Sequence, residues 1–217
     1  MRTNTTRLMK DNFPTYPARP HNGGPFKRDA NGRDNLSYNP EDYSFTPKYN
    51  GWRVLIHVPT RKTFNRYGEP LSIGKEFSTA LGDICSALDA EAFKWLDVEG
   101  LERRHSIGKG ALILLDVIPT DDYNGARYEE RGFWVTPSII PVHQLHTKPE
   151  ANGVYQAQRF SAGELSHNWN LMQQINKEWG CEFYEGVVAA RRDAPYPIQL
   201  RSPDQTTTSR IKHRWKF

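Results

Sequence analysis

Lys48 is the residue of this sequence whose surroundings are best suited to covalent chemistry. It begins the run Lys48-Tyr49-Asn50-Gly51-Trp52-Arg53. A lysine amine becomes nucleophilic when desolvation or nearby cations lower the pKa of its ammonium group, and a glycine lets a phosphate or ribose approach the backbone. Attack by such an amine on a phosphate divides one difficult group transfer into two easier steps. Taken alone, the same run is also typical of an ordinary turn.

Four further runs supply carboxylates and cations. Mg²⁺ prefers carboxylate oxygens and substrate phosphates, and cations stabilise the charge that develops on a leaving pyrophosphate. A strand end or a turn would explain each run equally well when it is considered alone. The four runs are Asn65-Arg66-Tyr67-Gly68-Glu69, Leu96-Asp97-Val98-Glu99-Gly100, Glu185-Gly186-Val187-Val188 and Ile211-Lys212-His213-Arg214.

The order and spacing of these runs resemble the nucleotidyltransferase domain of ATP-dependent polynucleotide ligases, DNA ligases above all. The resemblance covers most of the chain, from Lys48 to Arg214. Its closest part is the stretch from Glu185 to Tyr196, followed by Arg201-Ser202 and then Lys212-His213-Arg214. In the family the corresponding pattern is Glu-Gly-Val-Val-Ala-Lys-Arg, Ser-Pro-Tyr, Arg-Ser and Lys-x-Lys.

The resemblance implies a role for nine residues. Lys48 would receive AMP from ATP, and Lys48, Glu185 and Lys212 would carry the catalysis. Glu185, together with Glu99, would bind Mg²⁺ or Mn²⁺, whereas Asp97 is expected to be structural. The nucleotide-binding set implied by the resemblance is Thr46, Arg53, Arg66, Glu99, Leu115, Lys212 and Arg214.

Three positions depart from the family pattern. Asn50 stands where the family has aspartate, and Leu115 stands where an aromatic ring stacks on the adenine. Ala190 replaces a lysine, and the sequence leaves open whether Arg191 or Arg192 substitutes for it.

The chain is expected to fold as an α+β nucleotidyltransferase (ATP-grasp-like) domain of antiparallel sheets flanked by helices. Alternation of apolar residues predicts a β-hairpin from residues 53–58 and 63–66. A 3.6-residue period predicts helices over about 75–93 and 165–179. Buried strands are predicted over 111–117 and 182–190.

Residues 1–45, rich in proline, glycine and asparagine, are predicted to form an extended arm before a catalytic domain of residues 46–217. The adenylation site is expected to lie wholly after Thr46. The ligases normally continue into an OB-fold that closes over the duplex, and no such part follows Arg214 here. Either the chain is a minimal single-domain ligase, or a partner or the arm supplies the clamp. An arm packed against the domain is equally compatible with the sequence. The arm holds four candidate phosphate contacts. These are Arg19, Lys27, Arg28 and Arg33.

The composition sets limits on the class of protein. Ten Phe, ten Tyr and six Trp indicate a folded chain, and there is neither a signal core nor an apolar run long enough to cross a membrane. A cytoplasmic monomer is expected, with Cys85 and Cys181 reduced. Residues 191–217 hold seven basic and two acidic residues, a local charge of +5 within a total of +4. Such a segment attracts nucleic acid or a nucleotide triphosphate, although it can also be a solvated surface.

The resemblance implies an ATP-dependent ligase that seals nicks in duplex nucleic acid, with DNA preferred over RNA. An RNA ligase would share the same residues, because adenylation does not depend on the sugar. An mRNA-capping guanylyltransferase shares the lysine chemistry but normally relies on an OB domain. A non-enzymatic nucleic-acid-binding relative is the third alternative, and Asn50, Leu115 and Ala190 favour it.

Overall fold

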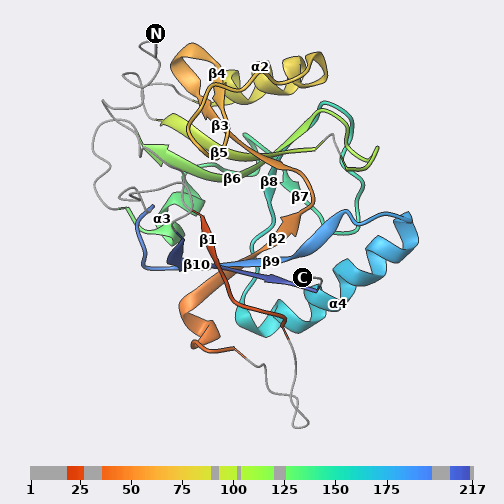
Figure 1. Ribbon diagram of the computed structural model, residues 1–217. Coiled ribbons are helices and arrows are strands. Elements are labelled where there is room, and N and C mark those ends of the chain that lie inside the picture. The colour runs from red at the N-terminus through yellow and green to blue at the C-terminus, as the bar shows by residue number, and fades with distance from the viewer. Residues whose placement is uncertain are drawn as a thin grey trace.

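Two β-sheets form the framework of the protein (Figure 1). The computed structural model describes residues 19–26, 36–88, 93–101, 104–119, 126–196 and 206–215. The four-stranded sheet has the order β1 (Pro20–Asn22), β10 (Thr207–Arg214), β9 (Tyr184–Arg191) and β2 (Tyr43–Tyr49). The six-stranded sheet has the order β4 (Lys62–Phe64), β3 (Trp52–His57), β5 (Phe93–Leu101), β6 (Ala111–Pro119), β8 (Val154–Ala157) and β7 (Val142–His143).

Most neighbouring strands are antiparallel, which confirms the predicted α+β class. Parallel pairing occurs where β1 joins β10 and where β8 joins β6 and β7. The helices are α2 (Ser78–Ala87), α3 (Tyr128–Phe133) and α4 (Ala162–Trp179), and three short 3-10 turns cover Pro40–Asp42, Val58–Thr60 and Lys75–Phe77.

The sequence located several elements correctly. The predicted hairpin is β3–β4, and the predicted strands correspond to β6 and β9. The second predicted helix is α4, which begins three residues earlier because Ser161 and Glu164 form a capping box there. The prediction of one helix over 75–93 was wrong at both ends. Residues 75–77 form a 3-10 turn, α2 ends at Ala87, and Phe93 begins β5, where pairing with β6 overrides the helical period.

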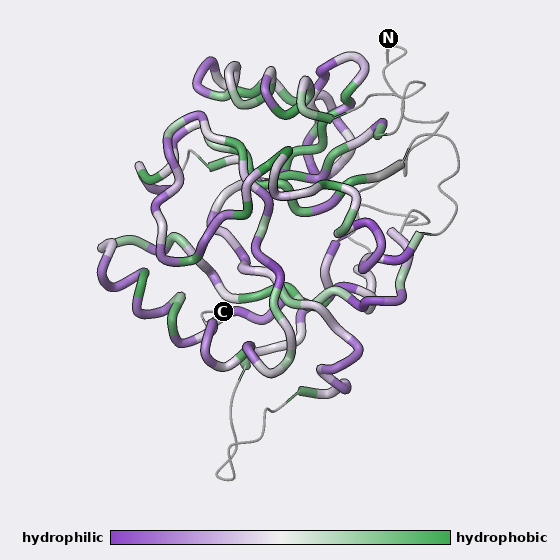
Figure 2. Tube along the Cα trace, turned by 180° about the vertical axis from the view of Figure 1, so that it is seen from behind, coloured by the Kyte–Doolittle hydropathy of each residue, from purple (hydrophilic) through white to green (hydrophobic). Residues whose placement is uncertain are grey.

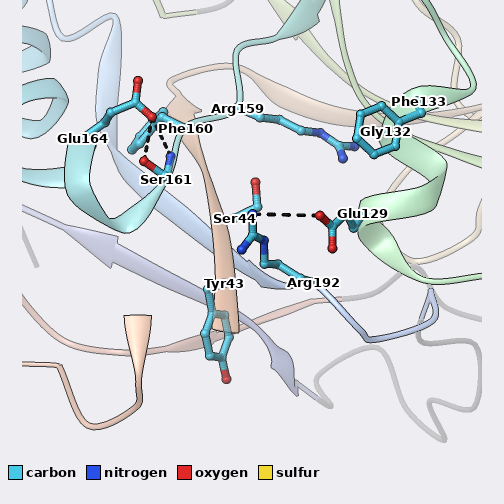
Figure 3. A pocket seen from close by; sticks show the side chains of 10 residues that line it. All are labelled: Tyr43, Ser44, Glu129, Gly132, Phe133, Arg159, Phe160, Ser161, Glu164 and Arg192. Carbon is cyan, nitrogen blue, oxygen red and sulfur yellow. Dashed lines mark hydrogen bonds and ion pairs between the residues drawn. The ribbon is translucent and has the colours of Figure 1, made fainter. Parts of the chain in front are cut away.

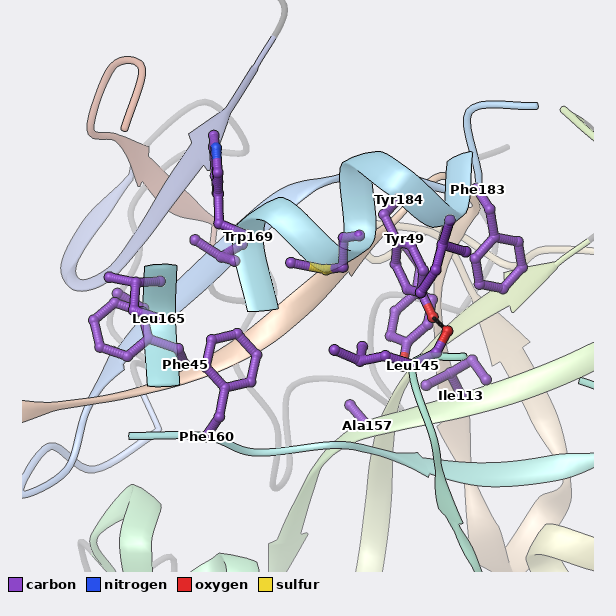
Figure 4. Close-up of a cluster of buried hydrophobic side chains, with 14 of the residues drawn as sticks. Phe45, Tyr49, Ile113, Leu145, Ala157, Phe160, Leu165, Trp169, Phe183 and Tyr184 are labelled. Atoms are coloured by element: carbon purple, nitrogen blue, oxygen red, sulfur yellow. Dashed lines mark hydrogen bonds between the residues drawn. The ribbon is translucent and has the colours of Figure 1, made fainter. Parts of the chain in front are cut away.

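Two apolar cores stabilise the sheets, and the first is shared by both sheets, because it includes Ile113 of β6 and Ala157 of β8 as well as residues of β2 and β9. One core packs α4 against β2 and β9, and its rings lie close together in Figure 4. Hydrophobic and hydrophilic residues alternate along α4, as Figure 2 shows from behind. The second core packs Phe77 and Ile84, both fully buried, against the six-stranded sheet. Burial of each such side chain contributes roughly 1.5–3 kcal/mol, so the two sheets are held as rigid walls.

Part of the predicted arm is integrated into the four-stranded sheet. The Gly23 N–H donates to the Lys212 carbonyl at 3.0 Å, and the Thr207 N–H donates to the Arg19 carbonyl at 2.9 Å. Phe26 is buried against Trp169, with ring centroids 5.1 Å apart. Lys27, Arg28 and Arg33 lie outside the described residues. The domain boundary near residue 45 stays a prediction.

Two smaller expectations concern membrane crossing and the cysteines. None of the helices in the described parts of the chain combines the length and apolar character needed to cross a membrane. Cys85 is buried, Cys181 is half-buried, and neither is in a disulfide.

Candidate functional site

A cavity of about 680 Å³ is lined by strands of both sheets. All nine residues that the sequence singled out for catalysis, nucleotide or metal line it. The structure therefore brings together side chains from five separate runs of the sequence. Three of these residues are in direct contact, because Lys48 and Arg214 both pair with Glu185.

Neighbouring strands position Lys48 and Glu185. Lys48 on β2 lies opposite Gly186 on β9, and its Nζ donates to Glu185 Oε2 at 2.5 Å. Gly186 has a φ of 145°, and a Cβ at this position would collide with the carbonyl oxygen of His213. Only glycine allows β10 to approach here, which is a physical reason for the Glu-Gly pair.

Glu185 is the carboxylate around which the cations gather. Arg214 lies 3.0 Å from its Oε2 and Arg104 lies 3.5 Å from its Oε1. Burial raises the pKa of the Glu185 carboxyl, but Lys48, Arg214 and Arg104 together outweigh that effect and hold it below its ordinary value. Glu185 is therefore ionised at neutral pH.

Glu99 lies in a different electrostatic environment. Its Oε1 accepts a hydrogen bond from the Gly51 N–H at 3.1 Å, which ties the glycine of the Lys48 run to β5. Burial raises the pKa of Glu99 to about 7, although Lys48, Gly51 and Arg53 oppose the rise. At neutral pH this carboxyl is therefore partly protonated, and a bound cation would drive it to the ionised form.

The cations of β10 lie on one face of that strand. Arg210, Lys212 and Arg214 recur every second residue, and all three line the cavity. Burial lowers the pKa of Lys212, and so do Arg214, Arg19, Lys48 and Arg66. This end of the cavity is thus strongly positive and suited to a polyanion.

Arg53 is held by protein groups as well as facing the cavity. It makes a bidentate ion pair with Asp97, and its Nη2 lies 3.1 Å from the Tyr196 hydroxyl. Asp97 is fully buried, in agreement with the expected structural role. Arg210 continues this network, because it pairs with Asp97 at 3.5 Å and also with Asp116.

Asn50 has a local reason to differ from aspartate. Its side-chain amide donates to the Glu182 carbonyl at 2.7 Å, and its Oδ1 accepts from Arg104 at 3.1 Å. An aspartate would face the Glu182 carbonyl without a proton to donate. The asparagine therefore belongs to the structure that supports Lys48.

The other two departures also have structural correlates. Leu115 lines the cavity, and the aromatic ring of Tyr128 lines it as well. Ala190 pairs in register with Arg210, which places a cation beside the alanine. Arg191 instead pairs with Asp193, and neither Arg191 nor Arg192 lines this cavity.

Arg192 lines a second cavity of about 280 Å³, shown in Figure 3. It lies there near Glu129, at 3.9 Å. None of the nine predicted site residues lines this second cavity.

Three arginines of the main cavity were missed or misplaced by sequence reasoning. Arg210 carried a signal, since it precedes Lys212 by two residues on a strand. Arg104 carried none, because it contacts Glu185 across 81 positions of sequence. Arg19 was expected only as a candidate phosphate contact of the arm, and the structure places it in the cavity wall together with Pro20. The cavity is therefore not confined to residues after Thr46. Arg201 and Ser202 lie outside the described residues.

Comparisons with known proteins bear on the fold. No family model and no curated protein matches this sequence. Among solved structures, the ligase domain of M. tuberculosis LigD matches with a TM-score of 0.56 and 16% identity, over 91% of this chain and 59% of that one. A mycobacterial DNA ligase D complexed with ATP and MES matches with a TM-score of 0.57 and 17% identity, over 93% and 60%. Chlorella virus DNA ligase-adenylate matches with a TM-score of 0.50 and 14% identity, over 91% and 69%.

These likenesses define the fold as that of a nucleotidyltransferase domain. More particularly, it is the fold of the adenylation domain of ATP-dependent DNA ligases, as the resemblance implied. The chain spans less than two thirds of the length of the two mycobacterial proteins.

Proposed function

We propose that this chain is an ATP-dependent polynucleotide ligase domain that transfers AMP through Lys48. The observation that carries the proposal is the contact of Lys48 Nζ with Glu185 Oε2 at 2.5 Å, inside a cavity lined by Lys212 and Arg214. A nucleophile, a carboxylate suited to a divalent cation and cations for the leaving group are thus adjacent. The fold shared with DNA ligase domains supports the same chemistry.

The first step would form a bond between Lys48 Nζ and the α-phosphorus of ATP. The bond from that phosphorus to the oxygen bridging to the β-phosphate breaks, and pyrophosphate leaves with the electron pair. The ammonium must first lose a proton to solvent, and a divalent cation held by Glu185 would favour this loss by weakening the ion pair that stabilises the charged form of Lys48. Lys212 and Arg214 stabilise the charge on the phosphates as it shifts to the leaving group.

Glu185 and Glu99 are suited to hold a divalent cation. Both line the cavity, and Mg²⁺ is usually held by one or two carboxylates together with substrate phosphates rather than by a full protein cage. The described residues contain no cluster of three or more His, Cys, Asp or Glu side chains that would form such a cage. The cation would draw charge from the α-phosphate, and Mn²⁺ could replace Mg²⁺.

In the later steps AMP would pass to a 5′-phosphate, and a 3′-hydroxyl would displace it. The expected substrate is a nicked duplex, with DNA preferred over RNA, bound by a monomer. The DNA ligases among the structural neighbours support DNA over RNA. A chain that seals nicked RNA and not nicked DNA would revise the substrate while leaving the lysine chemistry intact.

The decisive experiment is covalent labelling of the protein. We expect that α-labelled ATP leaves label on the denatured wild-type protein and that Lys48→Ala leaves none. Lys177→Ala is the matched control, because Lys177 is exposed on α4 and does not line the cavity. Label that persists in Lys48→Ala would exclude Lys48 as the nucleophile. Label from GTP and not ATP would indicate a guanylyltransferase instead.

A further inference from the structure

The segment around Arg19 is a fixed part of the cavity wall. Arg19 and Pro20 line the cavity, and β1 runs parallel to β10 with Asn22 opposite Lys212. Beyond β1, the Gly24 carbonyl lies 3.0 Å from His213 Nδ1, and Phe26 is buried in the core. Both sides of this short strand are therefore anchored to the domain.

The four-stranded sheet sets functional side chains in a row. Its order β2, β9, β10, β1 carries Lys48, Glu185, and then Lys212 with Arg214. Arg19 directly precedes β1, and its carbonyl accepts from the Thr207 N–H near the start of β10, so its side chain reaches the cavity from that end. Neighbouring strands lie roughly 4.8 Å apart, so β2 and β1 are about 14 Å apart with β10 and its cations between them. All these side chains line the same cavity.

A triphosphate fits such a row. If Lys48 meets the α-phosphate, the remaining phosphates can follow the cations across the sheet toward β1. Arg19 also lies near enough to Lys212 to help lower the pKa of that lysine, which shows that two positive charges are held close together. A phosphate bound between them would relieve this repulsion.

We propose that Arg19 contacts the phosphates of ATP beyond the α-phosphate and so binds the pyrophosphate leaving group. The inference rests on the proposed function. It gives the segment before Thr46 a role in the adenylation step rather than in clamping nucleic acid.

The test compares ligands that differ in their phosphates. Isothermal titration would measure the affinity of the full chain for three ligands: α,β-methylene ATP, AMP and pyrophosphate. The methylene group of the first ligand prevents transfer of AMP to the protein. Arg19→Ala should weaken the binding of α,β-methylene ATP and of pyrophosphate about 10-fold or more, because it removes a charge-assisted hydrogen bond. The affinity for AMP should change by no more than about twofold. Arg19→Lys should recover part of the loss. Lys177→Ala serves as the charge-matched control, and a thermal melt checks folding.

Each other outcome overturns the inference. If Arg19→Ala weakened the binding of AMP and of α,β-methylene ATP equally, Arg19 would only support the sheet. Unchanged triphosphate binding with weaker binding of nicked duplex would assign Arg19 to nucleic acid. Wild-type protein that binds no triphosphate would overturn the proposed function as well, whereas wild-type binding that Arg19→Ala leaves unchanged would overturn this inference alone.

Discussion

Asn50 acts as both donor and acceptor beneath the Lys48 loop. Its backbone N–H donates to the Phe183 carbonyl at 2.9 Å, and its side-chain amide donates to the Glu182 carbonyl at 2.7 Å. The residue is 7% exposed, so water cannot replace a lost partner easily. These contacts connect the turn after Lys48 to the residues just before β9.

Asn50→Asp should therefore destabilise the protein even though it restores the family pattern. The carboxylate would face the Glu182 carbonyl without a proton, at a cost on the order of 1–3 kcal/mol. Urea unfolding of the variant should show this loss. Asn170→Asp makes the same chemical change at an exposed position of α4 and should have little effect. A variant as stable as the wild type would show that the amide donor is dispensable.

Glu185→Gln should abolish Lys48 labelling and also reduce stability. The sequence alone gives no reason to expect a stability loss, but Glu185 pairs with Lys48, Arg214 and Arg104. Loss of its charge should lower the free energy of unfolding by on the order of 1–3 kcal/mol at pH 7. Each kcal/mol corresponds to a decrease in Tm of roughly 2–4 °C.

The stability difference between the wild type and Glu185→Gln should depend on pH, because the pKa of Glu185 changes on folding. Because the pKa is lowered on folding, the stabilisation by Glu185 is present above the ordinary carboxyl pKa and is lost as pH falls through the lowered value. The Tm gap between wild type and Glu185→Gln should therefore narrow in acid. Glu178→Gln, on the exposed face of α4, is the control. A gap that widens in acid would contradict the ion pairing.

At the scale of elements, a buried ionic network joins the two sheets. Asp116 on β6 accepts two hydrogen bonds from Arg131 of α3, at 2.9 and 2.8 Å, and pairs with Arg210 of β10. The Asp116 side chain is fully buried. Burial raises the pKa of Asp116, but Arg131 and Arg210 outweigh it and hold the pKa below its ordinary value. The network fixes β10 relative to the six-stranded sheet.

Asp116→Asn should be among the most destabilising single changes. It would remove the carboxylate that pairs with Arg131 and would leave Arg210 with Asp97 alone, at a cost of about 3–5 kcal/mol. Denaturant unfolding measures this loss, and Asp193→Asn is the comparison, since Asp193 pairs with Arg191 at the exposed end of β9 and should matter little. If both variants lost equal stability, burial would not be what makes the Asp116 pair important.

The sequence predicted those elements that have strong local patterns. The hairpin, β6, α4 and β9 were found because period and length agree there. The end of α2 was misjudged because pairing of Phe93 with β6 depends on a strand far along the chain. The residues of the candidate site likewise divide into those with a local sequence pattern and those placed by long-range contacts. Lys48 and Glu185 stand in recognisable runs, whereas the contacts of Arg104 and Arg19 exist only after the sheets have formed.

At the scale of the whole molecule, the charge distribution bears on nucleic-acid binding. The chain carries a formal net charge of +4. If its basic residues contact phosphates, log affinity for nicked duplex should fall linearly with log salt, with a slope near −0.9 per contact. Lys212→Ala combined with Arg214→Ala should flatten that slope by roughly two units and block Lys48 labelling.

A double variant of two lysines outside the cavity controls for net charge. Lys75→Ala with Lys177→Ala removes the same charge from exposed positions. Equal flattening in both double variants would mean that only total charge, and not the cavity face of β10, governs binding. Titration of both proteins across the same salt series makes the comparison.

The pairing of β1 with β10 also has a consequence for how the protein forms. The strands of the four-stranded sheet are residues 20–22, 43–49, 184–191 and 207–214, while all strands of the six-stranded sheet lie within residues 52–157. Long-range pairing is slow, because loop closure must precede the contacts that reward it. During synthesis on the ribosome the six-stranded sheet can therefore form first. The cavity's second wall appears only after Arg214 has emerged, so a nascent chain has no complete site until nearly all of this sequence has been translated.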